Sequence, residues 1–149
     1  MTIATTLLTL AAAVWVGAIV FQTAVVAPTV FASLDEAAAR LFLRRLFPRF
    51  FQLGICCGVL MIAAIAGAVA TRDWTETLGQ LAVLSVIMLL LEVISLAMVP
   101  RINAARDAGE AGKTTFSRLH LVSVLLTLTI LLLGIGVLAI VAMRAAASV

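Results

Sequence analysis

The sequence predicts an all-α membrane protein, a bundle of four transmembrane helices with a short amphipathic interfacial helix between the first two. Two observations carry this prediction. The chain is 64% hydrophobic and 11% charged, whereas a soluble domain carries about 25% charged residues. It also has four apolar stretches without period-two alternation, each longer than the roughly 20 residues that cross a hydrocarbon core as a helix. We therefore expect a single transmembrane domain over residues 1–149.

The first predicted span covers about residues 3–28. It ends at Pro28, because proline removes a backbone donor and stops or kinks a helix. The segment lacks the positively charged start of a signal peptide, and its apolar run is too long for one. We expect it to be retained in the mature protein.

Residues 34–47 predict the interfacial helix. Ser33 and Glu36 have the spacing of a capping box. Glu36, Arg40 and Arg44 recur every four residues and form a charged ridge on one side. Alanine, leucine and phenylalanine cover most of the rest, so this helix is expected to lie in the membrane interface with its arginines toward water.

The other spans are predicted at about 50–70, 79–100 and 118–143, with Pro48 before the second and Pro100 at the end of the third. Trp74 is expected at the membrane interface in an outer loop over residues 71–79. Residues 101–115 predict a polar loop, after which Thr114 or Thr115 is expected to cap the last helix.

The second span contains two pairs of small residues at four-residue spacing, Gly54 with Gly58 and Ala63 with Gly67. Such pairs let helices approach closely. In a span rich in glycine and alanine they also arise by chance, and both interpretations stay open.

The basic residues predict the orientation. Eight flank the first and third loops: Arg40, Arg44, Arg45, Arg49, Arg101, Arg106, Lys113 and Arg118. Arg72 and Arg144 are the basic side chains of the opposite side. Because cytoplasmic loops carry the excess of Lys and Arg, we expect loops 1 and 3 in the cytoplasm and both termini outside. The net charge of +3 thus reflects orientation, and we expect no nucleic-acid partner.

Glu92 is the acidic residue placed deep in an apolar span. An ionised acid there costs roughly 2.5 kcal/mol or more, so such residues usually face the bundle interior and often mark function. Ser85, Met88, Ser95 and Val99 lie three, four or seven residues from it, on one face of the helix. The last span carries a second polar face: Ser117, His120, Ser123, Thr127 and Gly134.

These faces predict a polar cavity that opens toward the cytoplasm. The expected lining residues are Gln22, Gln52, Glu92, His120 and Ser123, with Thr127 as a further ligand-binding candidate. The alternative is structural: Glu92 holds two helices together by a hydrogen bond, and His120 is an interfacial donor. Cys56 and Cys57 diverge by about 100° on a helix, so we expect small packing residues rather than a vicinal-thiol metal site.

Three motifs resemble the transmembrane-protein-205-like family, also called domain of unknown function 4149. They are FQTAVVAPTVFASL (21–34), RRLFPRFF (44–51) and FSRLHLVSVLLTLTILLLG (116–134). The matching positions are Pro28, Phe31, Leu46, Phe47, Pro48, Phe50, Phe51, Phe116, His120 and Ser123. The family pattern would place an aromatic such as Tyr where Arg49 or Phe50 stands, and an Asn near Thr127; the sequence departs from the pattern at these two places. The resemblance implies a four-helix bacterial inner-membrane (plasma-membrane) protein without an established activity.

Three functions remain open at this stage. The first is a module that binds or moves a small solute or ion, and because four helices rarely enclose a pore it would need a homo-oligomer. The second is a non-catalytic scaffold or accessory membrane subunit. The third is a haem- or metal-binding redox protein, since small bundles can hold such cofactors. The cofactor and any metal stay unknown. We expect no enzyme and no catalytic residue, because the sequence has no catalytic motif.

Overall fold

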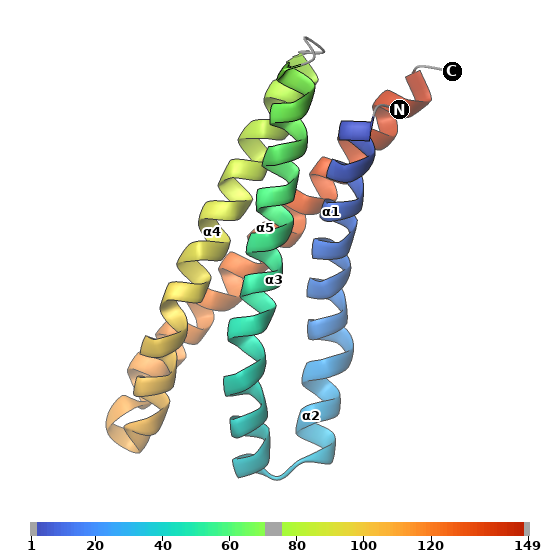
Figure 1. Ribbon diagram of the computed structural model, residues 1–149. Helices are drawn as coiled ribbons and strands as arrows, with labels where there is room; N and C mark the ends of the chain where they lie inside the picture. The colour runs from blue at the N-terminus through green and yellow to red at the C-terminus, as the bar shows by residue number, and fades with distance from the viewer. Residues whose placement is uncertain (1–2, 71–75, 148–149) are drawn as a thin grey trace.

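The computed structural model describes residues 3–70 and 76–147, which are almost entirely helical (Figure 1). Four helical stretches are long and apolar enough to cross a membrane: Ile3–Ser33, Glu36–Ala70, Glu76–Asp107 and Gly109–Ala147. This confirms the predicted all-α fold with four spans. The elements in order are α1 (Ile3–Phe21), a π-helical turn η1 (Gln22–Val26), α2 (Ala27–Ser33), α3 (Glu36–Ala70), α4 (Glu76–Asp107), a 3-10 turn η2 (Gly109–Gly112) and α5 (Lys113–Ala147).

The spans form a closed ring in which each packs against two neighbours. α1 contacts α3 and α5, and α4 contacts the same two helices. α1 and α4 are therefore diagonally opposite, and among the described residues none of their Cα atoms lie within 8 Å of each other. Contact across this diagonal has to come from long side chains.

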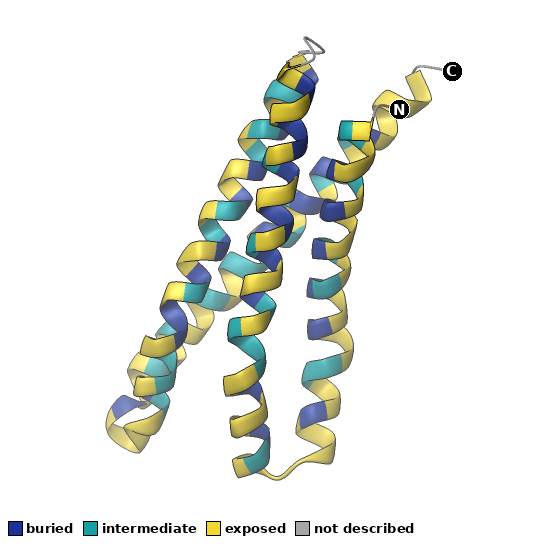
Figure 2. Cartoon of the chain, in the orientation of Figure 1, coloured by how far each residue is buried: buried dark blue, intermediate teal, exposed yellow. Residues whose placement is uncertain are grey.

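Burial follows the sides of the helices that face one another, and the outer sides are exposed (Figure 2). Trp15, Met61, Met88, Ile130 and Val137 are nearly inaccessible in the centre of the main core. The exposed side chains include many leucines, isoleucines and valines. An apolar outer surface of this kind is stable in hydrocarbon rather than in water.

The prediction of a separate interfacial helix at residues 34–47 is wrong. That segment forms the first turns of α3, which continues through Pro48 to Ala70. Proline removes one backbone hydrogen bond, which membrane helices tolerate when neighbouring side chains compensate. Phe47 and Phe51 stack across the proline with ring centroids 6.0 Å apart, and Leu43 is buried with Val30 in a small second core. These contacts pack the helix on both sides of the position where the backbone bond is missing.

The predicted capping box is also corrected. Ser33 ends α2, and Asp35 caps α3 by accepting a hydrogen bond of 2.9 Å from the backbone N–H of Ala38. The charged ridge is confirmed, since Arg40 pairs with Glu36 on the exposed side of α3.

Pro28 does not end the first span. A π-helical turn precedes it, in which the N–H of Ala27 donates to the carbonyl of Gln22. Pro28 then lies in the first turn of α2, where a missing N–H is tolerated. The additional residue in the π turn lets the helical stretch continue from Ile3 to Ser33.

The third span continues beyond Pro100 as well. α4 reaches Asp107, and α5 begins at Lys113 rather than at a threonine cap. Gly112 makes the tight connection possible, because a Cβ there would overlap the carbonyl oxygen of Ala105. Most of the predicted polar loop is therefore helical. In the predicted outer loop, residues 76–79 belong to α4, and Trp74 lies outside the described residues.

The connections α2–α3 and α4–α5 lie at one end of the bundle, and both termini lie toward the other end (Figure 1). Arg44 of α3 donates to both carboxylate oxygens of Asp107 of α4 at 2.6 Å and joins these two helices at the same end. The first and third loops therefore share a side, as the charge pattern predicted. Which compartment that side faces stays a prediction.

Candidate functional site

Glu92 lies in the bundle core. Its side chain is 2% exposed, and it is near the middle of α4, with Ser85, Met88, Ser95 and Val99 buried on the same face. The stripe predicted from residue spacing is confirmed. The two serine hydroxyls donate to carbonyls of their own helix, Ser85 to Leu81 and Ser95 to Leu91.

Gly54 of α3 provides the space that the Glu92 carboxyl occupies. A Cβ built on Gly54 would overlap Glu92 Oε1 and would lie 2.6 Å from Glu92 Cδ and 2.7 Å from Trp15 Nε1. The backbone of α3 is thus in contact with a carboxyl from α4 and an indole from α1. We refer to Trp15, Gly54 and Glu92 as the Glu92 centre.

Two polar atoms of the Glu92 centre have no hydrogen-bond partner among the described residues, Trp15 Nε1 and Glu92 Oε1. Both are fully buried and next to the same point above Gly54. A buried polar atom without a partner costs about 1–3 kcal/mol, and such atoms are rare in folded proteins. A donor and an acceptor therefore approach each other at mid-span, in a geometry that falls short of a regular hydrogen bond.

The two pairs of small residues in the second span differ in burial: one is buried and the other is exposed. Gly58 is buried with Gly54, and a Cβ there would lie 3.2 Å from Trp15 Cζ3 and 3.1 Å from Leu89 Cδ1. This pair is a close-approach face within the chain. Ala63 and Gly67 are exposed, and a Cβ on Gly67 would meet nothing within 4 Å.

The other predicted site residues do not all gather at Glu92. Gln22 is 6% exposed and begins the π turn of the first span. Ser123 and Thr127 of α5 are half-buried, and Thr127 Oγ1 donates to the Ser123 carbonyl at 3.0 Å. Gln52 is exposed. A ligand-binding role for these residues stays a prediction.

His120 is exposed and belongs to a cluster at the end of the bundle that holds loops 1 and 3. Its ring stacks on Phe116 with centroids 5.6 Å apart, and the Arg106 guanidinium lies 4.4 Å from the Phe116 centroid. The Phe-x-x-x-His spacing is one helical turn, which explains the stacking. In the described ranges, no hydrogen bond or ion pair joins His120 to Glu92.

The donor set for a metal or haem is poor. Within 3–70 and 76–147, no three His, Cys, Asp or Glu side chains form a group that could hold a metal ion. Cys56 is exposed and Cys57 is buried, so the two thiols diverge as expected. His120 stacks on Phe116 at the surface instead of facing the core where a haem would bind.

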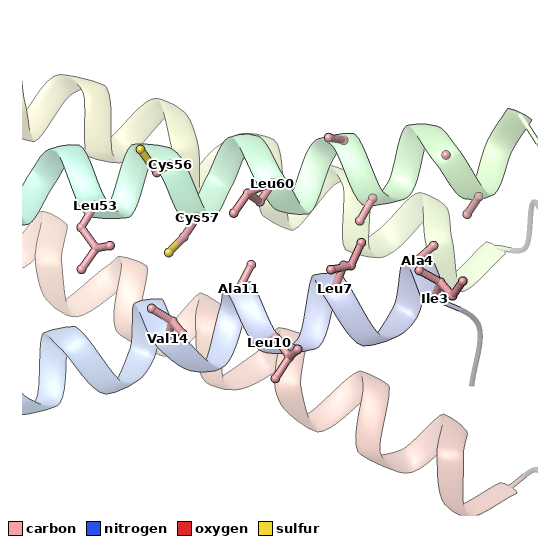
Figure 3. A pocket seen from close by; sticks show the side chains of 14 residues that line it. Ile3, Ala4, Leu7, Leu10, Ala11, Val14, Leu53, Cys56, Cys57 and Leu60 are labelled. Carbon is pink, nitrogen blue, oxygen red and sulfur yellow. The ribbon is translucent and has the colours of Figure 1, made fainter.

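A cavity of about 720 Å³ lies between α1 and α3, and its lining is apolar (Figure 3). It runs beside the first half of α1 and the second half of α3, away from loops 1 and 3. The lining residues are Ile3, Ala4, Leu7, Leu10, Ala11, Val14, Leu53, Cys56, Cys57, Leu60, Ala63, Ala64, Gly67 and Ala68. This groove has none of the polar residues predicted to line a cavity.

Trp15 is the site residue that sequence reasoning missed. Tryptophan in membrane proteins prefers the interface, and its N–H needs a partner when buried. A tryptophan in the middle of an apolar span was therefore a signal comparable to Glu92. Its pairing with Gly54 and Glu92 was not predictable, because it depends on the side chain crossing the bundle diagonal.

Comparison with known proteins identifies a family. The family described as "Domain of unknown function (DUF4149)" matches residues 10–111, which include all three residues of the Glu92 centre. The match ends before Phe116 and His120. No curated protein and no solved structure matches the chain significantly.

Proposed function

We propose a function from the premise that this chain belongs to the DUF4149 family and is a multi-pass membrane protein with four spans. The proposed function is non-enzymatic: the protein binds, and in a homo-oligomer moves, a proton or small ion at Glu92. The observation that carries it is the fully buried Glu92 Oε1, which has no partner and lies next to the equally unpartnered Trp15 N–H.

The packing around Glu92 favours a very small ligand. A single methyl group on Gly54 would overlap the carboxyl oxygen, so there is no room on this side for a larger solute. A proton needs no cavity. An ionised Glu92 would accept the Trp15 N–H after a small shift, and a protonated Glu92 would remove the cost of a charge at mid-span.

The decisive variant is Glu92→Gln, which keeps the size of the side chain and cannot exchange a proton. We expect wild-type protein in vesicles to take up protons under a valinomycin-imposed potassium potential and Glu92→Gln to lose this uptake. Glu76→Gln is the matched control, because it makes the same change at an exposed position of α4. Infrared titration gives a second readout: a protonated-carboxyl band that disappears in Glu92→Gln alone. Absence of both signals from wild type contradicts the proposal.

A second candidate, a scaffold or accessory subunit, is favoured by a different observation. The same carboxyl fills the space between three helices, so Glu92 also holds the diagonal pair α1 and α4 in place. If this is its role, Glu92→Gln lowers the thermal stability and leaves ion uptake unchanged.

We place the protein in the bacterial inner membrane with loops 1 and 3 in the cytoplasm. The orientation rests on the eight basic residues at that end against two at the other. A haem- or metal-binding role is the weakest alternative, because the single histidine is at the surface. A purified protein that absorbs visible light or contains bound metal would support this role.

A further inference from the structure

The end of the bundle that holds loops 1 and 3 carries more positive charge than its acids neutralise. Three acids there pair with three bases: Glu36 with Arg40, Asp107 with Arg44, and Glu110 with Lys113. Arg106 instead lies over the Phe116 ring. Within the described ranges, no acid forms a salt bridge with the four exposed arginines that remain: Arg45, Arg49, Arg101 and Arg118.

Three of these arginines lie at similar heights on neighbouring helices. Arg49 of α3 and Arg101 of α4 lie five and six residues inward from the Arg44–Asp107 ion pair. Arg118 of α5 lies two residues inward from Phe116, whose ring contacts Arg106. With a rise of about 1.5 Å per residue, the three differ by roughly one helical turn in height. We call them the arginine belt.

Each arginine of the belt continues a face that is exposed and apolar toward the middle of the bundle. One or two turns inward from Arg49, Arg101 and Arg118 stand Leu53, Ile94 and Val122, which are 43%, 49% and 44% exposed. Lipid chains cover such faces in a membrane protein. The arginines of the belt therefore border an exposed apolar surface on the side toward the middle of the bundle.

We propose that the arginine belt binds the headgroups of anionic phospholipids. A guanidinium pairs with phosphate in a planar, two-bond geometry, and its apolar stem can lie along the acyl-chain region. Three unpaired guanidiniums within roughly one helical turn of height on three adjacent helices suit a row of anionic headgroups beside α3, α4 and α5. This inference is independent of any role of Glu92.

The test is a competition between two lipids for the full-length chain. Delipidated protein is offered equimolar phosphatidylglycerol and phosphatidylcholine, and bound lipids are measured by native mass spectrometry. Wild type is expected to prefer phosphatidylglycerol. Each basic residue near a membrane contributes about fivefold in affinity, so Arg49→Gln/Arg101→Gln/Arg118→Gln is expected to lose a preference on the order of 100-fold.

The matched control removes three positive charges outside the belt: Arg40→Gln, Lys113→Gln and Arg144→Gln. It is expected to keep the preference within a few-fold. If the triple belt variant fails to fold, the single variants are expected to lose about fivefold each. Arg49→Lys keeps the charge but not the two-bond geometry, so it is expected to lose less than Arg49→Gln.

Two results overturn the proposal. One is an equal preference in wild type and in the belt variants. The other is complete displacement of phosphatidylglycerol by inorganic phosphate, which would show that the arginines take phosphate from water rather than from a lipid.

Discussion

At the scale of single residues, Glu92 is the unusual feature of this chain. A carboxyl group in the middle of a membrane span has to be protonated or paired with a donor. Trp15 brings an N–H to the same space, in a geometry that falls short of a regular hydrogen bond. On the other side of the α1–α4 diagonal, a Cβ on Gly134 would lie 2.6 Å from Val16 Cγ2 and 3.3 Å from Met88 Cε. The long side chains of α1 and α4 therefore meet between two glycines, one on α3 and one on α5.

This arrangement predicts that Gly54→Ala is destabilising. The new methyl group would overlap Glu92 Oε1, so the carboxyl has to move or the helices have to separate. Overpacking of this kind costs typically 1–3 kcal/mol. The measurement is the free energy of unfolding in mixed micelles.

Gly17→Ala is the control for that variant, because a Cβ on Gly17 would meet nothing within 4 Å. It should leave the stability unchanged or raise it by up to about 1 kcal/mol through helix propensity. Equal effects of the two variants would show that the Gly54 contact is unimportant.

At the scale of elements, the prolines explain most differences between expectation and structure. Each of Pro28, Pro48 and Pro100 marked a predicted boundary, and each lies within a continuous helical stretch. Local rules treat proline as a helix breaker because they assume that the lost hydrogen bond is not compensated. In this chain a π turn accommodates Pro28, and Phe47 and Phe51 stack across Pro48 within a continuous helix.

The continuity of α3 can be measured as a distance. With Cys56 and Cys57 replaced by alanine, spin labels on cysteines at Ala37 and Val59 should be about 33 Å apart along one straight helix. A helix that turns by a right angle at Pro48 into the interface would give about 23 Å. The shorter distance would restore the separate interfacial helix.

At the scale of the whole molecule, the Arg44–Asp107 ion pair and the shared end of the two connections place loops 1 and 3 on one side. An exposed ion pair contributes little stability, about 0–1 kcal/mol. The pair is informative because it shows that the start of α3 faces the end of α4. The charge pattern then predicts that this side is the cytoplasm.

Cysteine accessibility tests this topology. In a chain without native cysteines, Ser33→Cys and Ala108→Cys should react with a membrane-impermeant maleimide only after the membrane is permeabilised, whereas Ala146→Cys should react from outside. The reverse pattern would invert the orientation. Opposite responses of Ser33→Cys and Ala108→Cys would contradict the fold.

Composition and periodicity by themselves determined the membrane setting, the four spans and the inward face of α4, including Glu92. These properties are local, because twenty apolar residues or a repeat of three and four specify them without reference to other helices. Only the tertiary structure decided that Trp15 and Gly54 meet Glu92, that Gln52 and His120 stay at the surface, and that α3 runs through Pro48. The physical reason is that these outcomes depend on which helices are neighbours and on how each helix is rotated about its own axis. The local sequence of one helix specifies neither.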